Sequence, residues 1–415
     1  MLFPHSSPLA GLHPLLLWLL CTLPALGALL SRVPSLASTL TSPPSLLLIC
    51  LLVFPALLNY LFRSNDSASK RRLQFAEHVK RLQPAWHKPA PGCLYKEAYF
   101  VNERGMALMS MVARPAALPG DFPHDVWPVS PQPPPPKPKA VVIFCHGYSD
   151  SCTWIKGCTY RQHLVDAGYM LAGLELEGHG RSDGLNASLR YVPDWEAALA
   201  DVEAFARKTV AEGRFIGGAP KVFVAGESMG GALAFDLADR FPDLITGGAI
   251  LVSPMCAIHE KMKPPPAVIE GFRAVIGKPG SSDGVRGALG KLPLAPSADI
   301  GDYCYKDQNM RVIAEDVPSF YGRKPRLATA RELLNVTDRI SASLGSFDRP
   351  FLVLHGSADK VTDPALSQML FDSAKSKDKT IKIYDGAWHV LTTGEPEDVR
   401  AKVFKDMIAW LEKRL

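Results

Sequence analysis

A serine flanked by glycines is the residue of this chain best suited to act as a nucleophile. Ser228 lies in the motif Gly226-Glu-Ser-Met-Gly230, between an apolar run at 222–225 and an alanine-rich run at 232–238. The pattern predicts a buried strand, a sharp turn and a helix, with the serine hydroxyl exposed above a sheet. The two glycines leave no Cβ where the strand and the helix crowd together. By itself the motif fits either a nucleophile or an ordinary turn residue.

The base for this serine has to be found among the histidines, because a hydroxyl becomes a good nucleophile only when an imidazole takes its proton. Three histidines follow Ser228 in the chain, at positions 259, 355 and 389. In an α/β sheet, groups that react together meet at the carboxyl ends of parallel strands. We therefore choose His389, in the loop after the last expected strand, as the base. His355 ends a strand and is interpreted as a packing residue.

The imidazole in turn needs a carboxylate that fixes its tautomer and stabilises its cation. After the penultimate expected strand, the sequence offers Asp359 and Asp363. Asp359 sits in a loop, whereas Asp363 precedes Pro364 and has the position of a helix N-cap. Asp359 is therefore the predicted orienting acid. The resulting order of serine, aspartate and histidine is the one expected for this strand-turn-helix motif.

The negative charge that develops on an attacked carbonyl oxygen needs backbone N–H donors. The residue after the nucleophile, Met229, supplies one, at the start of a helix whose dipole favours negative charge. A loop after an early strand contains His146-Gly147-Tyr148. Tyr148 is the expected second donor, because Gly147 lets the backbone bend. The side chain of His146 is interpreted as holding this loop, and His179, in a later polar turn, as structural.

Composition argues against several other kinds of function. The 415 residues are 47% hydrophobic and carry a formal net charge of +5 without a long basic block, so a nucleic-acid partner is not expected. No HExxH motif and no Walker lysine occur, so the sequence predicts neither a metal nor another cofactor. The eight cysteines, including Cys21 and Cys50 in the N-terminal apolar runs, are scattered, which favours buried, reduced thiols over a disulfide framework.

From residue 140 onward, apolar runs alternate with helical patterns and predict a mostly parallel, doubly wound α/β sheet. An antiparallel hairpin is expected before it, with strands at 99–102 and 106–113. The proline-dense stretch 115–138 is expected to be an extended surface insertion. The expected strands of the sheet are 140–145, 169–174, 221–225, 248–252, 351–354 and 381–384, and the clearest helices are 193–211 and 396–415.

Residues 1–66 are expected to anchor the chain in the endoplasmic reticulum or on a lipid droplet, ahead of one catalytic domain at 67–415. Two apolar runs, 8–30 and 45–62, are long enough to cross a bilayer. Basic residues follow the second run, so the positive-inside rule places the catalytic domain in the cytosol. A cleaved secretory signal and a hairpin inserted into one leaflet are the alternatives. A basic amphipathic helix is expected at 68–82, either on a membrane surface or as a solvated linker.

With these residues assembled, the chain resembles the monoacylglycerol lipase group of the α/β-hydrolase superfamily, and its plant-type lysophospholipase-like members in particular. The resemblance implies an α/β-hydrolase fold, a triad of Ser228, Asp359 and His389, and oxyanion N–H groups from Tyr148 and Met229. The matching stretches, in chain order, are CHGYSD (145–150), GHGRSDG (178–184), GESMGG (226–231), SPMC (253–256), HGSADKVTDP (355–364) and KTIKIYDGAWH (379–389).

The resemblance further implies a helical lid at 255–344 that suits contact with a lipid surface, and hydrolysis of a lipid carboxylic ester through an acyl-enzyme. Monoacylglycerol is the expected substrate. The alternatives are a lysophospholipid, a phenolic ester of the caffeoylshikimate type, transfer of the acyl group to an alcohol, and a non-catalytic receptor. Animal monoacylglycerol lipases carry an acidic and basic pair after the oxyanion turn and a second histidine after the catalytic one. At these positions the present chain has Asp150, Trp154 and Thr392.

Overall fold

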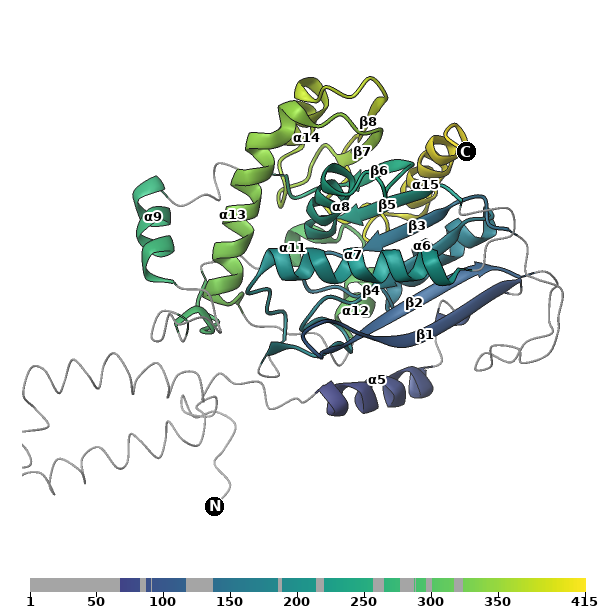
Figure 1. The fold of residues 1–415 in the computed structure, drawn as a ribbon, viewed down its shortest axis with the longest axis horizontal. Coiled ribbons are helices and arrows are strands. Elements are labelled where there is room, and N and C mark those ends of the chain that lie inside the picture. Colours follow the sequence, from purple (N-terminus) through teal and green to yellow (C-terminus); the bar gives the residue numbers. More distant parts are fainter. Residues whose placement is uncertain are drawn as a thin grey trace, which may run out of the picture.

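One sheet of eight strands organises the described part of the chain (Figure 1). The computed structural model describes residues 68–82, 87–90, 92–116, 137–185, 189–213, 220–256, 265–276, 287, 289–295, 301–316 and 324–415. The two expected membrane segments, 8–30 and 45–62, and most of the proline-rich insertion 115–138 lie outside these ranges. Within the ranges, no helix has both the length and the apolar character needed to span a bilayer.

The strands are joined mostly in parallel, as the sequence predicts. They are β1 (Cys93–Val101), β2 (Ala107–Pro115), β3 (Val141–Cys145), β4 (Met170–Leu174), β5 (Val222–Glu227), β6 (Gly248–Val252), β7 (Phe351–Gly356) and β8 (Lys379–Tyr384). Their order across the sheet is β1-β2-β4-β3-β5-β6-β7-β8. β2 pairs antiparallel with both β1 and β4, and every other neighbouring pair is parallel.

The first strand is longer than the sequence indicated. β1 begins at Cys93 instead of residue 99, and none of its residues is fully buried. Its polar residues, such as Lys96, lie on an edge strand, which lacks the apolar pattern by which core strands are recognised. By contrast, β3, β4, β5 and β6 are buried at every position. The bounds of these inner strands agree with the predicted ranges to within two residues.

Helices cover both faces of the sheet (Figure 1). On one face lie α7 (Trp195–Glu212), α8 (Met229–Arg240), α13 (Leu327–Ser343) and α14 (Pro364–Ser373), and on the other lie α6 (Ile155–Asp166) and α15 (Glu397–Glu412). Neighbouring residues of β5 show this division. Val224 packs in the core on the α7 and α8 side, whereas Phe223 packs against Trp410 of α15, with ring centroids 5.8 Å apart. The central strands are apolar at successive positions because both of their faces are buried.

The segment between β6 and β7 is an insertion with several helices, as expected for residues 255–344. Besides α13 it contains α9 (Pro266–Val275), α11 (Gly301–Cys304), α12 (Gln308–Glu315) and the short 3-10 helix η5 (Leu344–Ser346). α9 buries none of its side chains, and its Val268 and Val275 are 56% and 53% exposed. The role of this insertion as a lid stays a prediction.

Helix α5 (Ala68–Leu82) is docked on the catalytic domain. The guanidinium of Arg72 donates to the carboxylate of Asp183 at 2.9 Å. Phe75 is buried and packs edge-on against Trp154, with ring centroids 5.4 Å apart. The solvated-linker alternative is therefore wrong, because this helix uses apolar residues to pack inside the protein. Leu73 is 61% exposed, and contact of α5 with a membrane surface stays a prediction.

Replacement of Gly230 by alanine is expected to destabilise the fold. An alanine Cβ would lie 2.0 Å from the carbonyl oxygen of Cys145, where two backbone segments meet and neither can yield. We expect a loss of about 3 kcal/mol or more in the free energy of unfolding, and a fall in Tm of roughly 6–12 °C in scanning calorimetry. Gly271→Ala in α9 is the matched control, since its Cβ would meet nothing within 4 Å. An equal Tm for the two variants would contradict this packing.

Candidate active site

Ser228 occupies a strained turn between β5 and α8. Its backbone has a φ of 59°, a left-handed value that costs a non-glycine residue on the order of 1–3 kcal/mol. The glycines of the motif are required by close contact, because a Cβ at Gly226 would lie 2.0 Å from the carbonyl oxygen of Gly230. The strand, sharp turn and helix predicted from the motif are thus confirmed, and the serine in the turn is strained.

The loop after β3 lies directly against this serine turn. A Cβ at Gly147 would lie 3.2 Å from the carbonyl oxygen of Glu227 and 3.6 Å from the Cβ of Ser228. Glycine at 147 therefore allows these two segments to approach closely, whereas the sequence suggested that it permits a bend. Its φ is not positive, and Ser149 takes the left-handed conformation instead, with a φ of 71°.

Two ring side chains hold this loop in place. The hydroxyl of Tyr148 donates to the carbonyl oxygen of Arg190 at 3.1 Å. The buried ring of His146 accepts from the N–H of Leu176 through Nε2 at 3.0 Å and donates to the carbonyl oxygen of Gly147 through Nδ1 at 2.8 Å. Burial lowers the pKa of His146, so the ring stays neutral and keeps both bonds. These contacts support the interpretation of His146 as the residue that holds the loop.

The predicted acid and base are in hydrogen-bond contact. Nδ1 of His389 donates to Oδ2 of Asp359 at 2.7 Å, and both side chains are buried. The two residues follow β7 and β8, which are neighbouring parallel strands, so their carboxyl ends meet at one edge of the sheet. A proton on Nδ1 leaves Nε2 as the ring atom that can accept another proton.

The carboxylate of Asp359 accepts five hydrogen bonds. Besides the bond from His389, Oδ2 accepts from His355 at 3.0 Å and from the hydroxyl of Thr362 at 2.9 Å. Oδ1 accepts from the backbone N–H groups of Val361 at 2.7 Å and Thr362 at 3.0 Å. Burial alone would raise the pKa of Asp359, but the charge of His389 and the bonds from both histidines outweigh it and hold the pKa well below its usual range. The group is therefore an anion at neutral pH, suited to stabilise an imidazolium.

His355 also belongs to this network. The sequence had suggested only a packing role for it. The ring is fully buried, as a packing residue would be, but its Nε2 also donates to Asp359 at 3.0 Å. Its Nδ1 accepts from the hydroxyl of Ser367 at 2.7 Å. The sequence signal for this contact was a histidine at the end of a strand, four residues before Asp359. His355 gives the carboxylate a second imidazole donor, which favours its ionised form.

Two further polar residues have the structural roles that the sequence predicts. Asp363, the alternative acid, caps α14 and accepts from the N–H of Ala365 at 2.9 Å. This confirms its interpretation as an N-cap. The buried ring of His179 donates through Nδ1 to the carbonyl oxygen of Glu177 at 3.0 Å, in agreement with the structural role predicted for it.

Among the described side chains, no group of three or more His, Cys, Asp and Glu has the arrangement of a metal site. The six described cysteines are free, and five of them are buried while Cys93 is half-buried. Burial raises the pKa of the Cys145 thiol to about 12, so this thiol stays protonated and unreactive. The prediction of buried, reduced thiols is confirmed for five of these six, and Cys93 is free but only half-buried. Cys21 and Cys50 lie outside the described residues.

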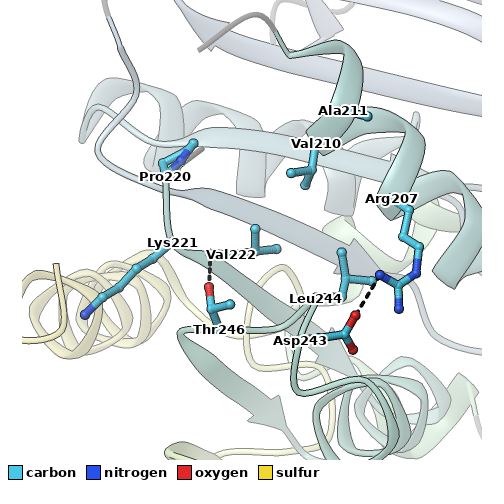
Figure 2. A pocket seen from close by; sticks show the side chains of 9 residues that line it. All are labelled: Arg207, Val210, Ala211, Pro220, Lys221, Val222, Asp243, Leu244 and Thr246. Atoms are coloured by element: carbon cyan, nitrogen blue, oxygen red, sulfur yellow. Dashed lines mark hydrogen bonds and ion pairs between the residues drawn. The ribbon is translucent and has the colours of Figure 1, made fainter. Parts of the chain in front are cut away.

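A surface hollow of about 420 Å³ lies at the amino end of β5, whereas Ser228 follows its carboxyl end (Figure 2). It is lined by Lys221 and Val222 at the beginning of β5 and by Leu244 and Thr246 before β6. Ser228 follows the other end of β5, roughly 20 Å along the strand. The hollow is therefore separate from the candidate active site.

Residues 136–397 match the profile of the Hydrolase_4 family, described as "Serine aminopeptidase, S33". The match spans more than half of the chain and includes Ser228, Asp359 and His389. The chain belongs to the Hydrolase_4 family. This membership agrees with the resemblance to α/β-hydrolases that the sequence motifs indicated.

Two relatives of this Hydrolase_4 protein carry the names of ester hydrolases. The chain is 31% identical to caffeoylshikimate esterase of Arabidopsis thaliana over 279 residues, which cover 67% of this chain and 79% of the relative. It is 29% identical to monoglyceride lipase of Homo sapiens over 291 residues, which cover 67% of this chain and 84% of the relative. Both alignments extend over most of the relative's length.

A solved structure shares the fold of this Hydrolase_4 protein. It is a soluble variant of monoglyceride lipase from Saccharomyces cerevisiae in complex with a substrate analogue. The TM-score is 0.56 at 18% sequence identity, and the match covers 77% of this chain and 96% of that chain. Together with the parallel sheet and its two helical layers, this likeness confirms the predicted α/β-hydrolase fold.

Proposed function

We propose that this Hydrolase_4 protein is a serine hydrolase of carboxylic esters, with Ser228 as nucleophile, His389 as general base and Asp359 as orienting acid. The family and the names of the lipase and esterase relatives support this reaction class. The observation that carries the proposal is the 2.7 Å bond between Nδ1 of His389 and Asp359. This bond selects the imidazole tautomer with a free Nε2, which is the form a serine hydroxyl needs as its base.

The proposed reaction has two steps. In the first, Oγ of Ser228 bonds to the ester carbonyl carbon while its proton passes to Nε2 of His389. The bond from this carbon to the alcohol oxygen then breaks, the alcohol takes the proton, and an acyl-enzyme is left. In the second, water gives a proton to His389 and adds to the acyl carbon, and the serine leaves with that proton as the carboxylic acid is released. Asp359 stays ionised in both steps.

The backbone N–H groups of Met229 and Tyr148 are the proposed donors to the oxygen that becomes negative in each step. Met229 is the first residue of α8, where the helix dipole favours negative charge. Tyr148 follows Gly147, the residue through which its loop contacts the serine turn. Loss of one such donor costs about 100- to 1000-fold in kcat in enzymes of this type.

Monoacylglycerol is the proposed substrate, with fatty acid and glycerol as products. The monoglyceride lipase relative supports this choice, and the exposed apolar residues of α9 suit contact with lipid. The positions that differ from animal monoacylglycerol lipases are engaged within the protein. The indole N–H of Trp154 donates to the carbonyl oxygen of Ile313 at 3.0 Å, and the hydroxyl of Thr392 donates to Glu227 at 2.6 Å. Other residues therefore have to recognise the glycerol end.

A phenolic ester of the caffeoylshikimate type is the second candidate substrate. The identity of 31% to the Arabidopsis esterase favours it, as do the positions at which this chain differs from animal monoacylglycerol lipases. Both candidates use the same nucleophile and base, so they differ only in which alcohol leaves. The choice between them therefore rests on kcat/KM and not on the presence of activity.

A substrate panel tests this choice on the full-length protein in detergent micelles. We expect kcat/KM for long-chain monoacylglycerols to exceed that for lysophospholipids and caffeoyl shikimate by about tenfold or more, which corresponds to about 1.4 kcal/mol of transition-state binding. We expect the free fatty acid to remain the product when an alcohol acceptor is added, because the acyl-enzyme is hydrolysed by water. The reverse ranking, with caffeoyl shikimate first, would replace monoacylglycerol by the second candidate.

We also propose that segments 8–30 and 45–62 hold the protein at the endoplasmic reticulum or a lipid droplet, with the catalytic domain in the cytosol. The basic residues after the second segment support this orientation. Endoglycosidase treatment of the protein from cells provides the measurement. No shift in mass is expected, because the acceptor sites at Asn65, Asn186 and Asn335 would then face the cytosol. Removal of a glycan from any of them would contradict the orientation.

A further inference from the structure

A buried ion cluster lies next to the serine turn. Lys156 of α6 makes ion pairs with Oδ2 of Asp150 at 2.9 Å and with Oε2 of Glu227 at 3.1 Å. The side chains of Lys156 and Glu227 are 6% and 0% exposed. The hydroxyl of Thr392 donates to the same oxygen of Glu227 at 2.6 Å. The carboxylate of Glu227 therefore has partners from two other segments of the chain.

These partners come from the segments that carry the proposed catalytic groups. Glu227 is the residue directly before Ser228. Asp150 lies in the loop between β3 and α6, which supplies one of the proposed oxyanion donors and contacts the serine turn. Thr392 lies three residues after His389, in the loop that follows β8. The lysine and the glutamate thus connect the nucleophile, the oxyanion loop and the base.

We propose that Lys156 and Glu227 are positioning residues for ester hydrolysis, which keep the oxyanion loop and the loop of His389 aligned with the serine turn. This inference rests on the proposed function, because it assigns the cluster to the same nucleophile and base. Neither side chain is assigned a contact with the substrate. Their effect is on the geometry in which the attacking oxygen, the base and the two N–H donors meet.

The charge balance of the cluster argues against a purely stabilising role. The cluster holds two carboxylates and one ammonium group. Burial would lower the pKa of Lys156, but Asp150 and Glu227 outweigh this and raise the pKa well above its usual value, so the lysine stays charged. The cluster therefore has one negative charge in excess. Buried ion pairs often stabilise a fold no more than well-packed apolar residues do. A role in positioning the serine turn therefore explains these buried charges better than a role in stability does.

Glu227→Gln separates positioning from stability. The amide has the size of the carboxylate, and Lys156 keeps Asp150 as its counter-ion, so the change buries no unpaired charge. We therefore expect a Tm within about 3 °C of the wild type or above it. The lysine no longer holds the serine turn by charge, and a displacement of about 1 Å in a catalytic group costs up to about 100-fold. We expect kcat to fall by about 10- to 100-fold while KM changes by less than about twofold.

Thr392→Val tests the link to the loop of His389. The substitution removes the hydroxyl that donates to Glu227 and keeps the shape of the side chain. We expect kcat to fall by about 3- to 10-fold, the net value of a typical intramolecular hydrogen bond. Because Thr392 acts through Glu227, the double variant E227Q/T392V should lose no more activity than Glu227→Gln alone. A general loss of packing would instead make the two effects additive.

The experiment measures kcat, KM and Tm of the full-length protein and these variants with p-nitrophenyl butyrate. Lys139→Met is the control, because its ion pair with Glu412 at 2.7 Å lies at the surface, with side chains 46% and 39% exposed, and it should keep the wild-type kcat. The inference is overturned if Glu227→Gln keeps kcat within about twofold of an active wild type, or if its loss of kcat accompanies a loss of Tm. A wild type that does not hydrolyse the ester would overturn the proposed function itself, and the inference with it.

Discussion

Replacement of Ser228 by alanine is expected to lower kcat by about 10⁵- to 10⁶-fold. Without the hydroxyl no acyl-enzyme forms, and the remaining rate is what substrate binding and the oxyanion donors sustain alone. Steady-state hydrolysis of a fluorogenic ester measures this loss. Ser357→Ala is the control, because the hydroxyl of this exposed serine forms hydrogen bonds in the neighbouring turn, with Asp385 and Gly386. Residual turnover within about tenfold of the wild type would show that another residue is the nucleophile.

Ser228→Gly extends the same prediction to stability. Ser228 has a φ of 59°, which glycine adopts without strain. We expect this variant to be inactive and yet more stable than the wild type by about 1 kcal/mol, measured as a shift of the denaturant midpoint. Lost activity together with increased stability would distinguish a strained turn that serves catalysis from an ordinary turn. Lower stability for the glycine variant would contradict the strain.

Replacement of Asp359 by asparagine is expected to lower kcat by about 10⁴-fold. The amide nitrogen donates where the carboxylate oxygen accepts, so the ring of His389 is driven to the tautomer that has its proton on Nε2. This tautomer cannot take the proton of the serine hydroxyl. Because the carboxylate does not bind substrate in this account, KM should change much less than kcat.

Asp363→Asn is the matched control for this variant. Asparagine caps a helix about as well as aspartate does, so the N-cap of α14 is preserved and kcat should stay within about twofold of the wild type. Both variants can be compared on one ester under the same conditions. A large loss in Asp363→Asn with little loss in Asp359→Asn would mean that the wrong aspartate had been chosen as the acid.

The features that could be predicted from the sequence are those with a local signal. The serine turn is specified by a strand, two glycines and a helix within one short stretch, and the contact between Gly226 and Gly230 shows why this spacing is required. The inner strands were found because burial on both faces makes them continuous apolar runs. Asp363 was correctly separated from Asp359 because an N-cap followed by Pro364 is also a local pattern.

What the sequence did not reveal depends on contacts between distant segments. Helix α5 has a helical pattern, but its packing through Phe75 depends on Trp154, which lies far along the chain. Gly147 was expected to permit a bend, whereas its close contact with Ser228 is visible only in the folded chain. The edge strand β1 has no continuous apolar pattern because none of its residues is fully buried.

The network around Asp359 was only partly predicted for the same reason. The pairing with His389 followed from the order of the strands, but the second bond from His355 requires knowing how the loop after β7 folds back. No sequence motif links Lys156 to Glu227, because the lysine comes from α6 and the glutamate from the end of β5. Hydrogen bonds and ion pairs of this kind depend on tertiary placement, which periodicity does not encode.

The most direct test of the central claim is to map the adduct of a fluorophosphonate on the full-length protein by peptide mass spectrometry. The reagent reacts with a serine that an imidazole has activated. We expect a single adduct, on Ser228, that forms as ester hydrolysis is lost and that is absent from the Ser228→Ala variant. An adduct on a different residue, or hydrolysis that continues in protein labelled at Ser228, would contradict the account.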